Sequence, residues 1–523
     1  MRRQERLRLY STAAPDMPTI PTMTNGSTSR VSHRKFADLA IAGIFICLMA
    51  VQIARHQMWR DELNAWGLVL ASPTLPELFH NLHYEGHPGL WHFLLWCASW
   101  FTRSPGAMKA VHACIAVGFI LLIAFRSPFT RLEKILILLN FYVVFEYAVV
   151  SRNYGVGLLL ALIYVQLRVT RPDRLVLNAT VLGLLANTNV YAAIMSGALA
   201  CEVVVDRFAT SRWLILRTVR QLAPAAIVYL GFLLFCAVTI NPATDISWRT
   251  TDYPFQHSLA PLRLLWVMIH YLDVGLVPAA RWLEELPRPR DMLLGLALLP
   301  IFSSIVIWQF RRDWRPLLTL GLTALGVVAF GQLVYPGSIR HWGIIFVAFV
   351  VALWMQRWTH REPKRHLGVL VILAFGALAG IREIERDAVQ PHSLAGAAAQ
   401  WLLRNEPSVA TLIGTPDTVA AAVAELLDRP MYFLDCNCVD TFLRYTKRRD
   451  DYKEEQLVDR LDLAMKSVSA RPMVLVTNSA LSQNELSAID ARRMTARSVA
   501  SFTGAFEPDE NFYLDEVTDG IRQ

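Results

Sequence analysis

The sequence predicts an α-helical polytopic membrane protein of about 11 to 13 transmembrane helices, followed by a small C-terminal α/β soluble domain. Of its 523 residues, 54% are hydrophobic and only 18% are charged, whereas roughly a quarter of the residues in a soluble domain are charged. The apolar residues fall in blocks of about 17 to 25, the length that crosses a hydrocarbon core as a helix. From Pro391 onward these blocks give way to short alternating strand and helix patterns.

The net charge of +8 is unevenly distributed along the chain. Residues 391–523 hold 14 Lys and Arg against 20 Asp and Glu, a net charge of −6, which leaves +14 for the preceding part. Positive charge in short loops beside apolar blocks marks the cytoplasmic side of a membrane. The basic character is therefore a topology signal, and we expect no nucleic-acid partner.

Residues 1–35 are expected to form a disordered, basic cytoplasmic tail, because Arg and Lys occur there among Pro, Ser and Thr without apolar periodicity. The first apolar block, 36–53, begins too late and runs too long for a cleaved signal peptide. We therefore expect an uncleaved first span with its N-terminus inside, followed by an external first loop at 55–88 with short amphipathic helices along the interface. The transmembrane domain as a whole is expected to cover 36–385.

Further apolar blocks are expected to cross the membrane before the soluble domain. Block 89–102 is short for a span and is a candidate re-entrant segment; counted as a full crossing, it places the basic loop 126–134 outside, against the positive-inside rule. An odd total of crossings would place the C-terminal domain outside. The other expected spans are 107–125, 132–150, 154–169, 175–188, 190–206, 217–239, 291–310, 315–334, 339–357 and 366–381, with 260–280 as a further candidate.

The soluble domain is expected to cover 391–523 and to have an accessory or docking role. Gly414 stands without the second and third glycines of a phosphate-binding loop, so no nucleotide is expected. The expected elements are a strand at 409–414, a helix at 418–427, a strand at 431–435, a helix at 454–469 and a strand at 473–477.

The seven cysteines indicate no disulfide framework. Five of them lie in or beside apolar blocks, where a thiol behaves as a small hydrophobe. Cys436 and Cys438 are separated by one residue, a spacing that gives poor disulfide geometry and lacks the second pair needed for a structural zinc site. Both are expected to be structurally neutral.

Asp61 and Glu62 open the first external loop and are the candidate catalytic residues. A carboxylate in a partly desolvated pocket can take a proton from an acceptor hydroxyl as that hydroxyl attacks a sugar carbon, which is general-base catalysis. Asp61 is the candidate base. The alternative is structural, because acidic residues at the start of an interfacial helix interact favourably with the helix dipole.

Polar side chains at three other span ends are candidate substrate-binding residues. Pro88 suits a helix start, but a helix start does not account for Glu85 and His87, which could bind sugar hydroxyls or a lipid phosphate. An arginine in a low-dielectric pocket could stabilise a departing phosphate through two hydrogen bonds. Alternatively, arginines and aromatic residues at span ends anchor helices at lipid headgroups. The further candidates are Arg152, Tyr154, Arg340 and His341.

Three histidines of the first loop, His80, His83 and His87, fall at i, i+3 and i+7, close to one helical face. Three imidazoles can hold zinc. Gly86 and Pro88 argue against a continuous helix through His87, so no metal ligand is assigned. A divalent cation held by carboxylates stays open as a cofactor.

The order of these features resembles the GT-C superfamily of membrane glycosyltransferases, which includes protein O-mannosyltransferases and bacterial aminoarabinose transferases. The resemblance rests on an Asp-Glu opening of the first loop, a His-Pro start to the next segment and an Arg-x-Tyr junction, over about residues 36–170. It extends more loosely to Arg340 and His341. Many relatives have His-Pro-Pro or Lys-Pro-Pro where this chain has His87-Pro88-Gly89.

The resemblance implies transfer of a sugar from a polyprenyl-phosphate donor to a glycan, lipid or protein acceptor on the non-cytoplasmic face, with inversion from a single displacement. Asp61 matches the first-loop Asp at the family's catalytic centre. The expected location is a bacterial inner membrane, with the catalytic loop and the C-terminal domain in the periplasm.

Two other classes of function are compatible with parts of the sequence. A basic membrane domain with buried arginines could belong to a transporter or flippase of lipid-linked sugars, but no internal repeat is evident and the polar groups gather at span ends. A scaffold protein could keep a similar shape without catalysis.

Overall fold

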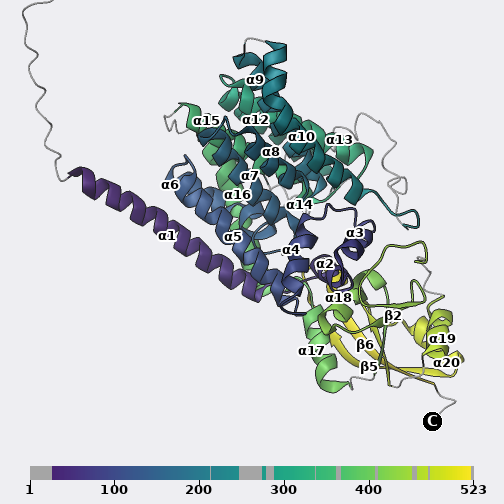
Figure 1. The fold of residues 1–523 in the computed structure, drawn as a ribbon. Coiled ribbons are helices and arrows are strands. Elements are labelled where there is room, and N and C mark those ends of the chain that lie inside the picture. Colours follow the sequence, from purple (N-terminus) through teal and green to yellow (C-terminus); the bar gives the residue numbers. More distant parts are fainter. Residues whose placement is uncertain are drawn as a thin grey trace, which may run out of the picture.

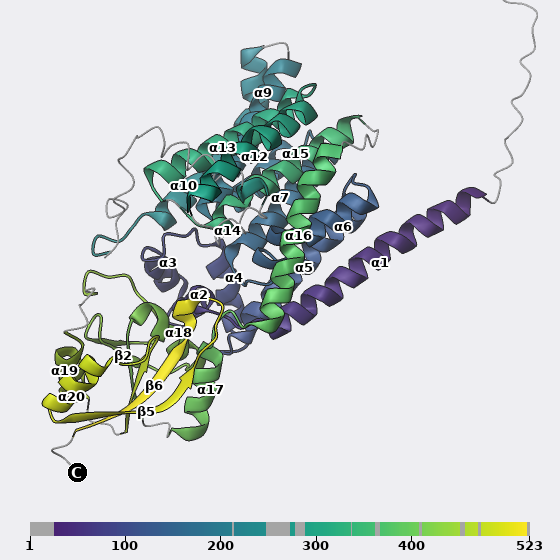
Figure 2. The same ribbon diagram turned by 180° about the vertical axis from the view of Figure 1, so that it is seen from behind.

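The computed structural model describes residues 26–211, 214–246, 272, 274–277, 288–335, 337–360, 367–406, 410–449, 456–468 and 472–519. A bundle of long helices forms most of the molecule, and an α/β domain packs against one end of it (Figure 1). The view from behind shows the helix α1 (Gly26–Arg55) angled away from the bundle toward its N-terminal end, with its C-terminal end close to the α/β domain (Figure 2).

Seven helical stretches in the described part are long and apolar enough to cross a membrane, which makes the protein a multi-pass membrane protein. The shorter apolar helices include α4 (Leu90–Ser99) and α8 (Leu175–Ala186). The total of 11 to 13 crossings remains a prediction, and most of the further candidate 260–280 lies outside the described residues. The seven stretches lie in α1 (Gly26–Arg55), α5 (Gly106–Arg126), α7 (Asn153–Thr170), α10 (Ile215–Ile240), α13 (Trp314–Leu333), α14 (Ile339–Trp342) with α15 (Ile344–His360), and α16 (Leu367–Val389). Two further helices complete the bundle, α9 (Val190–Thr210) and α12 (Arg288–Phe310).

The first helix is longer than its apolar block. α1 begins at Gly26 and therefore includes residues 26–35, which the sequence assigned to the disordered tail. Arg and Lys are good helix formers, so a helix started by the apolar block can extend into basic sequence at little cost. The rest of that tail, 1–25, lies outside the described residues.

The apolar block 132–150, expected as one span, is interrupted. α6 (Arg131–Leu139) begins at a Thr130–Glu133 capping box and stops at Asn140, and a π-helical turn, η1 (Tyr142–Glu146), follows. Asn140 accepts a hydrogen bond from the Tyr142 amide at 3.0 Å, which offers the backbone an alternative to the regular helix ladder. The chain is thereby redirected to the start of α7, next to the first loop.

The first loop folds as two short helices, α2 (Arg60–Leu70) and α3 (Leu75–Leu82). The expectation of helices is correct. α2 is enclosed by other parts of the protein, because every residue from Glu62 to Val69 is buried. It packs between α4 and helix α18 (Asp417–Leu427) of the α/β domain. Gly67 permits this approach, since a β-carbon there would meet Phe442 and Glu425 within 3.0 Å.

The α/β domain is built on a six-stranded mixed sheet with the strand order β3-β2-β1-β4-β6-β5. β1 pairs in parallel with β2 and β4, and the other pairings are antiparallel. The five elements expected from the sequence correspond to β1, α18, β2, α19 and β4. The elements are α17 (Ala395–Asn405), β1 (Thr411–Gly414), α18 (Asp417–Leu427), β2 (Met431–Phe433), β3 (Cys438–Asp440), α19 (Leu457–Ser467), β4 (Met473–Thr477), α20 (Gln483–Ala491), β5 (Met494–Phe502), η6 (Pro508–Glu510) and β6 (Phe512–Asp519).

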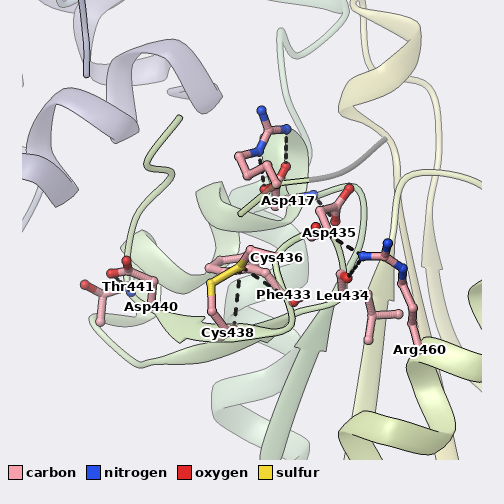
Figure 3. The surroundings of a disulfide bond; sticks show 10 residues. Asp417, Phe433, Leu434, Asp435, Cys436, Cys438, Asp440, Thr441 and Arg460 are labelled. Carbon is pink, nitrogen blue, oxygen red and sulfur yellow. Dashed lines mark hydrogen bonds and ion pairs between the residues drawn. A yellow bond between two sulfur atoms is a disulfide. The ribbon is translucent and has the colours of Figure 1, made fainter. Parts of the chain in front are cut away.

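Cys436 and Cys438 form a disulfide, contrary to the neutral role that their spacing predicted (Figure 3). They flank a tight turn between β2 and β3, and their α-carbons are 5.2 Å apart, within the range that a disulfide requires. The residue between them, Asn437, has a left-handed backbone with φ 46°, a conformation that Asn tolerates better than most residues. This turn brings the two thiols together.

Polar contacts fasten the α/β domain to the first loop. Arg60 donates to Asp509 at 2.6 Å, and its Nε lies 3.5 Å from the buried Glu510. Asn64 of α2 accepts a hydrogen bond from the Leu443 amide at 3.0 Å. The domain is therefore attached to the loop that carries the candidate base.

Candidate active site

Three of the charged residues predicted from the sequence meet at one point. The carboxylate of Asp61, at the start of α2, lies 2.7 Å from the guanidinium of Arg340 and 3.4 Å from that of Arg152. Arg152 also donates a hydrogen bond to the Asp61 carbonyl. The side chains of Asp61, Arg340 and Arg152 are 30%, 19% and 11% exposed, so the carboxylate is accessible while the two arginines are largely buried.

The arginines keep Asp61 ionised. Burial by itself raises the pKa of Asp61, but the positive charges of Arg340, Arg152 and Arg60 together outweigh it and lower that pKa to about 2. Arg340 is in turn stacked over the ring of Trp59, with 4.9 Å between its guanidinium carbon and the ring centre. Asp61 is therefore an anion fixed between two cations.

Glu62 points the other way and is fully buried. Its carboxylate lies 3.0 Å from His56 Nε2 and accepts a hydrogen bond from the Ser151 amide at 2.6 Å. The other ring nitrogen of His56 lies 3.1 Å from Asp387 of α16. Glu62 thus connects α2 to the residue before Arg152, and its geometry favours a positioning role over the catalytic role predicted for it.

The two carboxylates set the charge of His56. Burial lowers the pKa of His56, but the charges and hydrogen bonds of Glu62 and Asp387 outweigh burial and raise it to about 9. Burial likewise raises the pKa of Glu62, and the charge of His56 outweighs it, so that the pKa is lowered. At neutral pH the cluster is therefore an imidazolium between two carboxylates, enclosed where α1, α2 and α16 meet.

Glu85 is a second carboxylate near Asp61. It accepts a hydrogen bond from the side-chain amide of Asn64. Burial raises the pKa of Glu85 to about 7, the charge of Asp61 adds to this increase, and the charge of Arg152 opposes it. Burial, followed by the charge of Glu85, raises the pKa of Glu425 in α18 well above its ordinary value.

His87 is neutral in this setting. Its Nε2 lies 3.4 Å from the guanidinium of Arg152 and can accept a hydrogen bond from it. Burial, reinforced by the charge of Arg152, lowers the pKa of His87 to about 3. His87 can orient Arg152 or bind a hydroxyl group, but it supplies no positive charge for a phosphate.

Tyr154 and His341 form an aromatic group beside Arg340. The Tyr154 ring lies 5.6 Å from the His341 ring and stacks on Tyr147 at 5.7 Å. Nδ1 of His341 accepts a hydrogen bond from the Ser338 amide at 2.8 Å, which caps α14 and fixes the neighbouring Arg340. The hydroxyl of Tyr154 and the Nε of Arg340 are both buried without a hydrogen-bond partner among the described residues.

Several residues at the site escaped the sequence analysis. Tyr445 belongs to the α/β domain and lies close enough to Asp61 and Glu85 for their charges, together with burial, to raise its pKa. Nothing in the local sequence around Tyr445 indicated this. His56 could have been noticed, because a histidine directly after an apolar span and before the Asp61 motif is an unusual place for an ionisable group.

The three first-loop histidines do not converge. His83 donates from Nδ1 to the carbonyl of Asn241 at 2.5 Å, while His87 contacts Arg152. Within the described parts of the chain, no group of three or more His, Cys, Asp or Glu side chains is arranged to hold a metal ion.

Scans against protein-family models and curated protein sequences find no match. The fold, however, is similar to that of a solved structure, ArnT from Cupriavidus metallidurans in the apo state, a GT-C glycosyltransferase. The TM-score is 0.50 at 11% sequence identity, over 94% of this chain and 98% of that one. The same enzyme bound to undecaprenyl phosphate gives a TM-score of 0.48 at 12% identity, with the same coverage. The comparison confirms the fold that the resemblance implied: over nearly its whole length, this chain has the fold of the solved ArnT structure.

Proposed function

We propose that this protein transfers a sugar from a polyprenyl-phosphate donor to an acceptor hydroxyl on the non-cytoplasmic face of the membrane. The observation that carries the proposal is the placement of Asp61 between Arg340 and Arg152. An accessible carboxylate beside two buried arginines provides a proton acceptor and an anion-binding site within one hydrogen-bonded group.

Unsatisfied polar atoms support a phosphate at this place. A buried donor without a partner destabilises a structure by about 1 to 3 kcal/mol, and both the Arg340 Nε and the Tyr154 hydroxyl are of this kind. A phosphate group offers several acceptor oxygens that could bind to both. We therefore assign Arg340, Arg152 and Tyr154 to the donor phosphate.

The proposed reaction is a single displacement at the anomeric carbon. The acceptor oxygen forms a bond to that carbon and gives its proton to Asp61, while the bond from the anomeric carbon to the phosphate oxygen breaks. The phosphate leaves with the electron pair, and the two arginines stabilise the added negative charge. One displacement inverts the configuration of the sugar, and no nucleotide takes part.

The disulfide supports placing the site outside the cytoplasm. Disulfides form and persist in oxidising compartments and are rare in the cytosol. Cys436 and Cys438 belong to the domain that supplies Tyr445 to the site, so the domain and the site lie on one side of the membrane. In a bacterium with two membranes, that side is the periplasmic face of the inner membrane.

The first experiment measures release of free polyprenyl phosphate from a mixed pool of lipid-linked sugars in proteoliposomes that also contain candidate glycan, lipid and protein acceptors. Wild type, Asp61→Asn and Asp173→Asn are compared, because Asp173 is 88% exposed, pairs with Arg207 and lies far along the chain from the site. We expect release by wild type and Asp173→Asn, and none by Asp61→Asn. Loss of release with EDTA would reveal a divalent cation.

Two outcomes would contradict the proposal. Equal release by wild type and Asp61→Asn would remove Asp61 from the chemistry. Movement of the intact donor across the bilayer by all three proteins, without release of polyprenyl phosphate, would identify a flippase instead.

A further inference from the structure

A pocket of about 250 Å³ lies where the α/β domain meets two segments of the membrane part. Tyr84 of the first loop and Asp245, in the segment after α10, form one side of it. The β2–β3 turn and the chain that follows β3 form the other. The disulfide lies on this second side, near Phe433 and Asp440 (Figure 3).

The pocket is built from chain segments that hold one another in place. The Tyr84 hydroxyl donates to Asp245 at 2.8 Å, and the Lys447 amide donates to the Asp245 carbonyl at 2.7 Å. Ile246 and Thr446 form an antiparallel bridge. These contacts join the first loop, the segment after α10 and the α/β domain, so the lining of the pocket is preformed.

The pocket is connected to the loop that carries Asp61. Leu443 lines the pocket, and its amide donates a hydrogen bond to Asn64 of α2 at 3.0 Å. Asn64 in turn donates to Glu85. Next along the chain, the Thr446 amide donates to the Arg444 carbonyl at 2.8 Å, so the chain turns tightly at Tyr445, whose pKa is raised by burial and by the charges of Asp61 and Glu85.

The lining offers hydrogen-bond donors and acceptors in balance. Arg444 and Arg448 form no ion pair with another described residue. Asp417 already accepts hydrogen bonds from Nε and one Nη of Arg449, at 2.6 Å each, which leaves Asp245 and Asp440 as the acidic residues of the lining that are available to a ligand. Two guanidinium groups and two carboxylates give no net charge, which favours neither an anion nor a cation.

A neutral sugar matches this lining. Each hydroxyl group both donates and accepts hydrogen bonds, so a ring with several hydroxyls can use guanidinium and carboxylate groups together. The volume lies slightly below the roughly 300 to 1,000 Å³ of common small-molecule sites, which favours a single sugar unit over a lipid tail. We infer that this pocket binds a neutral sugar unit of the acceptor, beside the place where the new glycosidic bond forms; this inference rests on the proposed transferase function.

The test fills the pocket without touching the candidate active site. Val439 lines the pocket and is 60% exposed, so Val439→Trp adds bulk to the pocket without disturbing a core. Leu463→Trp is the matched control, because Leu463 is 49% exposed on α19 of the same domain and does not line the pocket. Arg448→Gln, at an exposed position in the lining, is a second variant that removes charge without adding bulk.

The probes are octyl glycosides of glucose, galactose, mannose and N-acetylglucosamine, with octyl phosphate as the anionic comparison. Binding to the full-length protein in nanodiscs is followed by saturation-transfer NMR, and transfer is followed in proteoliposomes. For at least one glycoside, we expect binding to wild type and to Leu463→Trp. We expect the KM for that acceptor to rise tenfold or more in Val439→Trp, and to rise less in Arg448→Gln. Release of polyprenyl phosphate to water, without any glycoside, should be unchanged in all three variants.

The outcomes separate this inference from the proposed function. Three results would overturn the sugar pocket: wild-type affinity in both Val439→Trp and Arg448→Gln, no binding of any neutral glycoside, or a preference for octyl phosphate. In each case, release of polyprenyl phosphate by wild type would still support a transferase. Failure of wild type to release polyprenyl phosphate would contradict the transferase itself.

Discussion

Asp61 is ionised in the substrate-free protein because two arginines hold it, and that state limits it as a base. A carboxylate with a pKa of about 2 accepts a proton weakly near neutral pH. A donor phosphate would compete for the guanidinium groups of Arg340 and Arg152 and neutralise much of their charge. Binding of the donor should therefore raise the pKa of Asp61 and make it a stronger base when the acceptor arrives.

The pH dependence of the reaction tests this coupling. Asp61 acts only when ionised, so activity is retained above its pKa and lost as the pH falls through it. The profile of kcat/KM reports the free protein and that of kcat reports the complex. We expect that, when both are measured between pH 3.5 and 7.5, kcat begins to decline at a higher pH than kcat/KM does. If the two quantities declined at the same pH, the result would argue against competition between Asp61 and the donor phosphate for the arginines.

Glu85 is the alternative base, since its pKa of about 7 suits proton transfer at neutral pH. If Glu85 has the substrate-binding role predicted for it from the sequence, Glu85→Gln should change kcat less than tenfold. Asp61→Asn should lower kcat by about 100- to 10,000-fold, the usual contribution of a general base. Single-turnover rates with saturating donor make the comparison, and a reversed order of the two effects would assign the base to Glu85.

At the scale of elements, the His56 cluster connects the end of α1, the start of α2 and α16 to the residue before Arg152. The pKa of His56 is about 9 in the folded protein, against roughly 6.5 for an unfolded chain. The stability from this cluster is thus fully present below about pH 6.5 and is lost progressively as the pH rises to about 9.

Thermal unfolding of wild type and His56→Gln between pH 6 and 10 tests the cluster. We expect the wild-type Tm to fall across pH 6.5 to 9 more steeply than the Tm of His56→Gln. Glu62→Gln should lower kcat and raise the donor KM, since it shifts Arg152, a residue assigned to the donor phosphate, through Ser151. Parallel Tm curves for wild type and His56→Gln would show that His56 is not charged in the folded protein.

The elements also show where sequence patterns are informative. Long apolar helices such as α5 and α7 match their predicted spans within a residue or so, because length and composition determine them. The break at Asn140 was missed because the apolar composition continues through it, and the contact with α16 that accommodates it is distant in sequence. β6 was missed although Phe512, Leu514 and Val517 are fully buried, because acidic residues between them resemble a loop.

At the scale of the whole molecule, two ion pairs that differ in burial join the α/β domain to the membrane part, and we expect them to contribute unequally to its docking. Arg103 and Asp428 are 62% and 37% exposed, and such a pair contributes about 0 to 1 kcal/mol. Arg60 is 25% exposed and also faces the fully buried Glu510, so its removal leaves that carboxyl group without a compensating charge.

Hydrogen exchange in nanodiscs can compare these pairs. Arg60→Ala should increase amide exchange in α2 and α18, which pack against each other, more than Arg103→Ala does. Global Tm should change little in either variant if the domain undocks without unfolding. Equal exchange in both variants would contradict a special role for the contact between Arg60 and Glu510.

The members of the candidate site were predictable one by one, but their arrangement was not. Asp61, Arg152 and Arg340 were identifiable because ionisable groups near the membrane interior cost free energy, so their presence at span ends indicates a function. Their meeting point depends on how the bundle closes, and the approach of Tyr445 depends on how a separate domain docks. Neither is encoded in local periodicity.

The contact between Asp61 and Arg340 spans 279 residues of sequence, and this has a consequence for biosynthesis. While the chain is being synthesised and inserted, Asp61 is in place long before its partner exists. The candidate site is completed only when α14 and the helices around it have entered the membrane. A stalled or truncated chain would carry the proposed base without the groups assigned to the phosphate. Under the proposed function, such incomplete molecules would be inactive, and activity would report complete insertion.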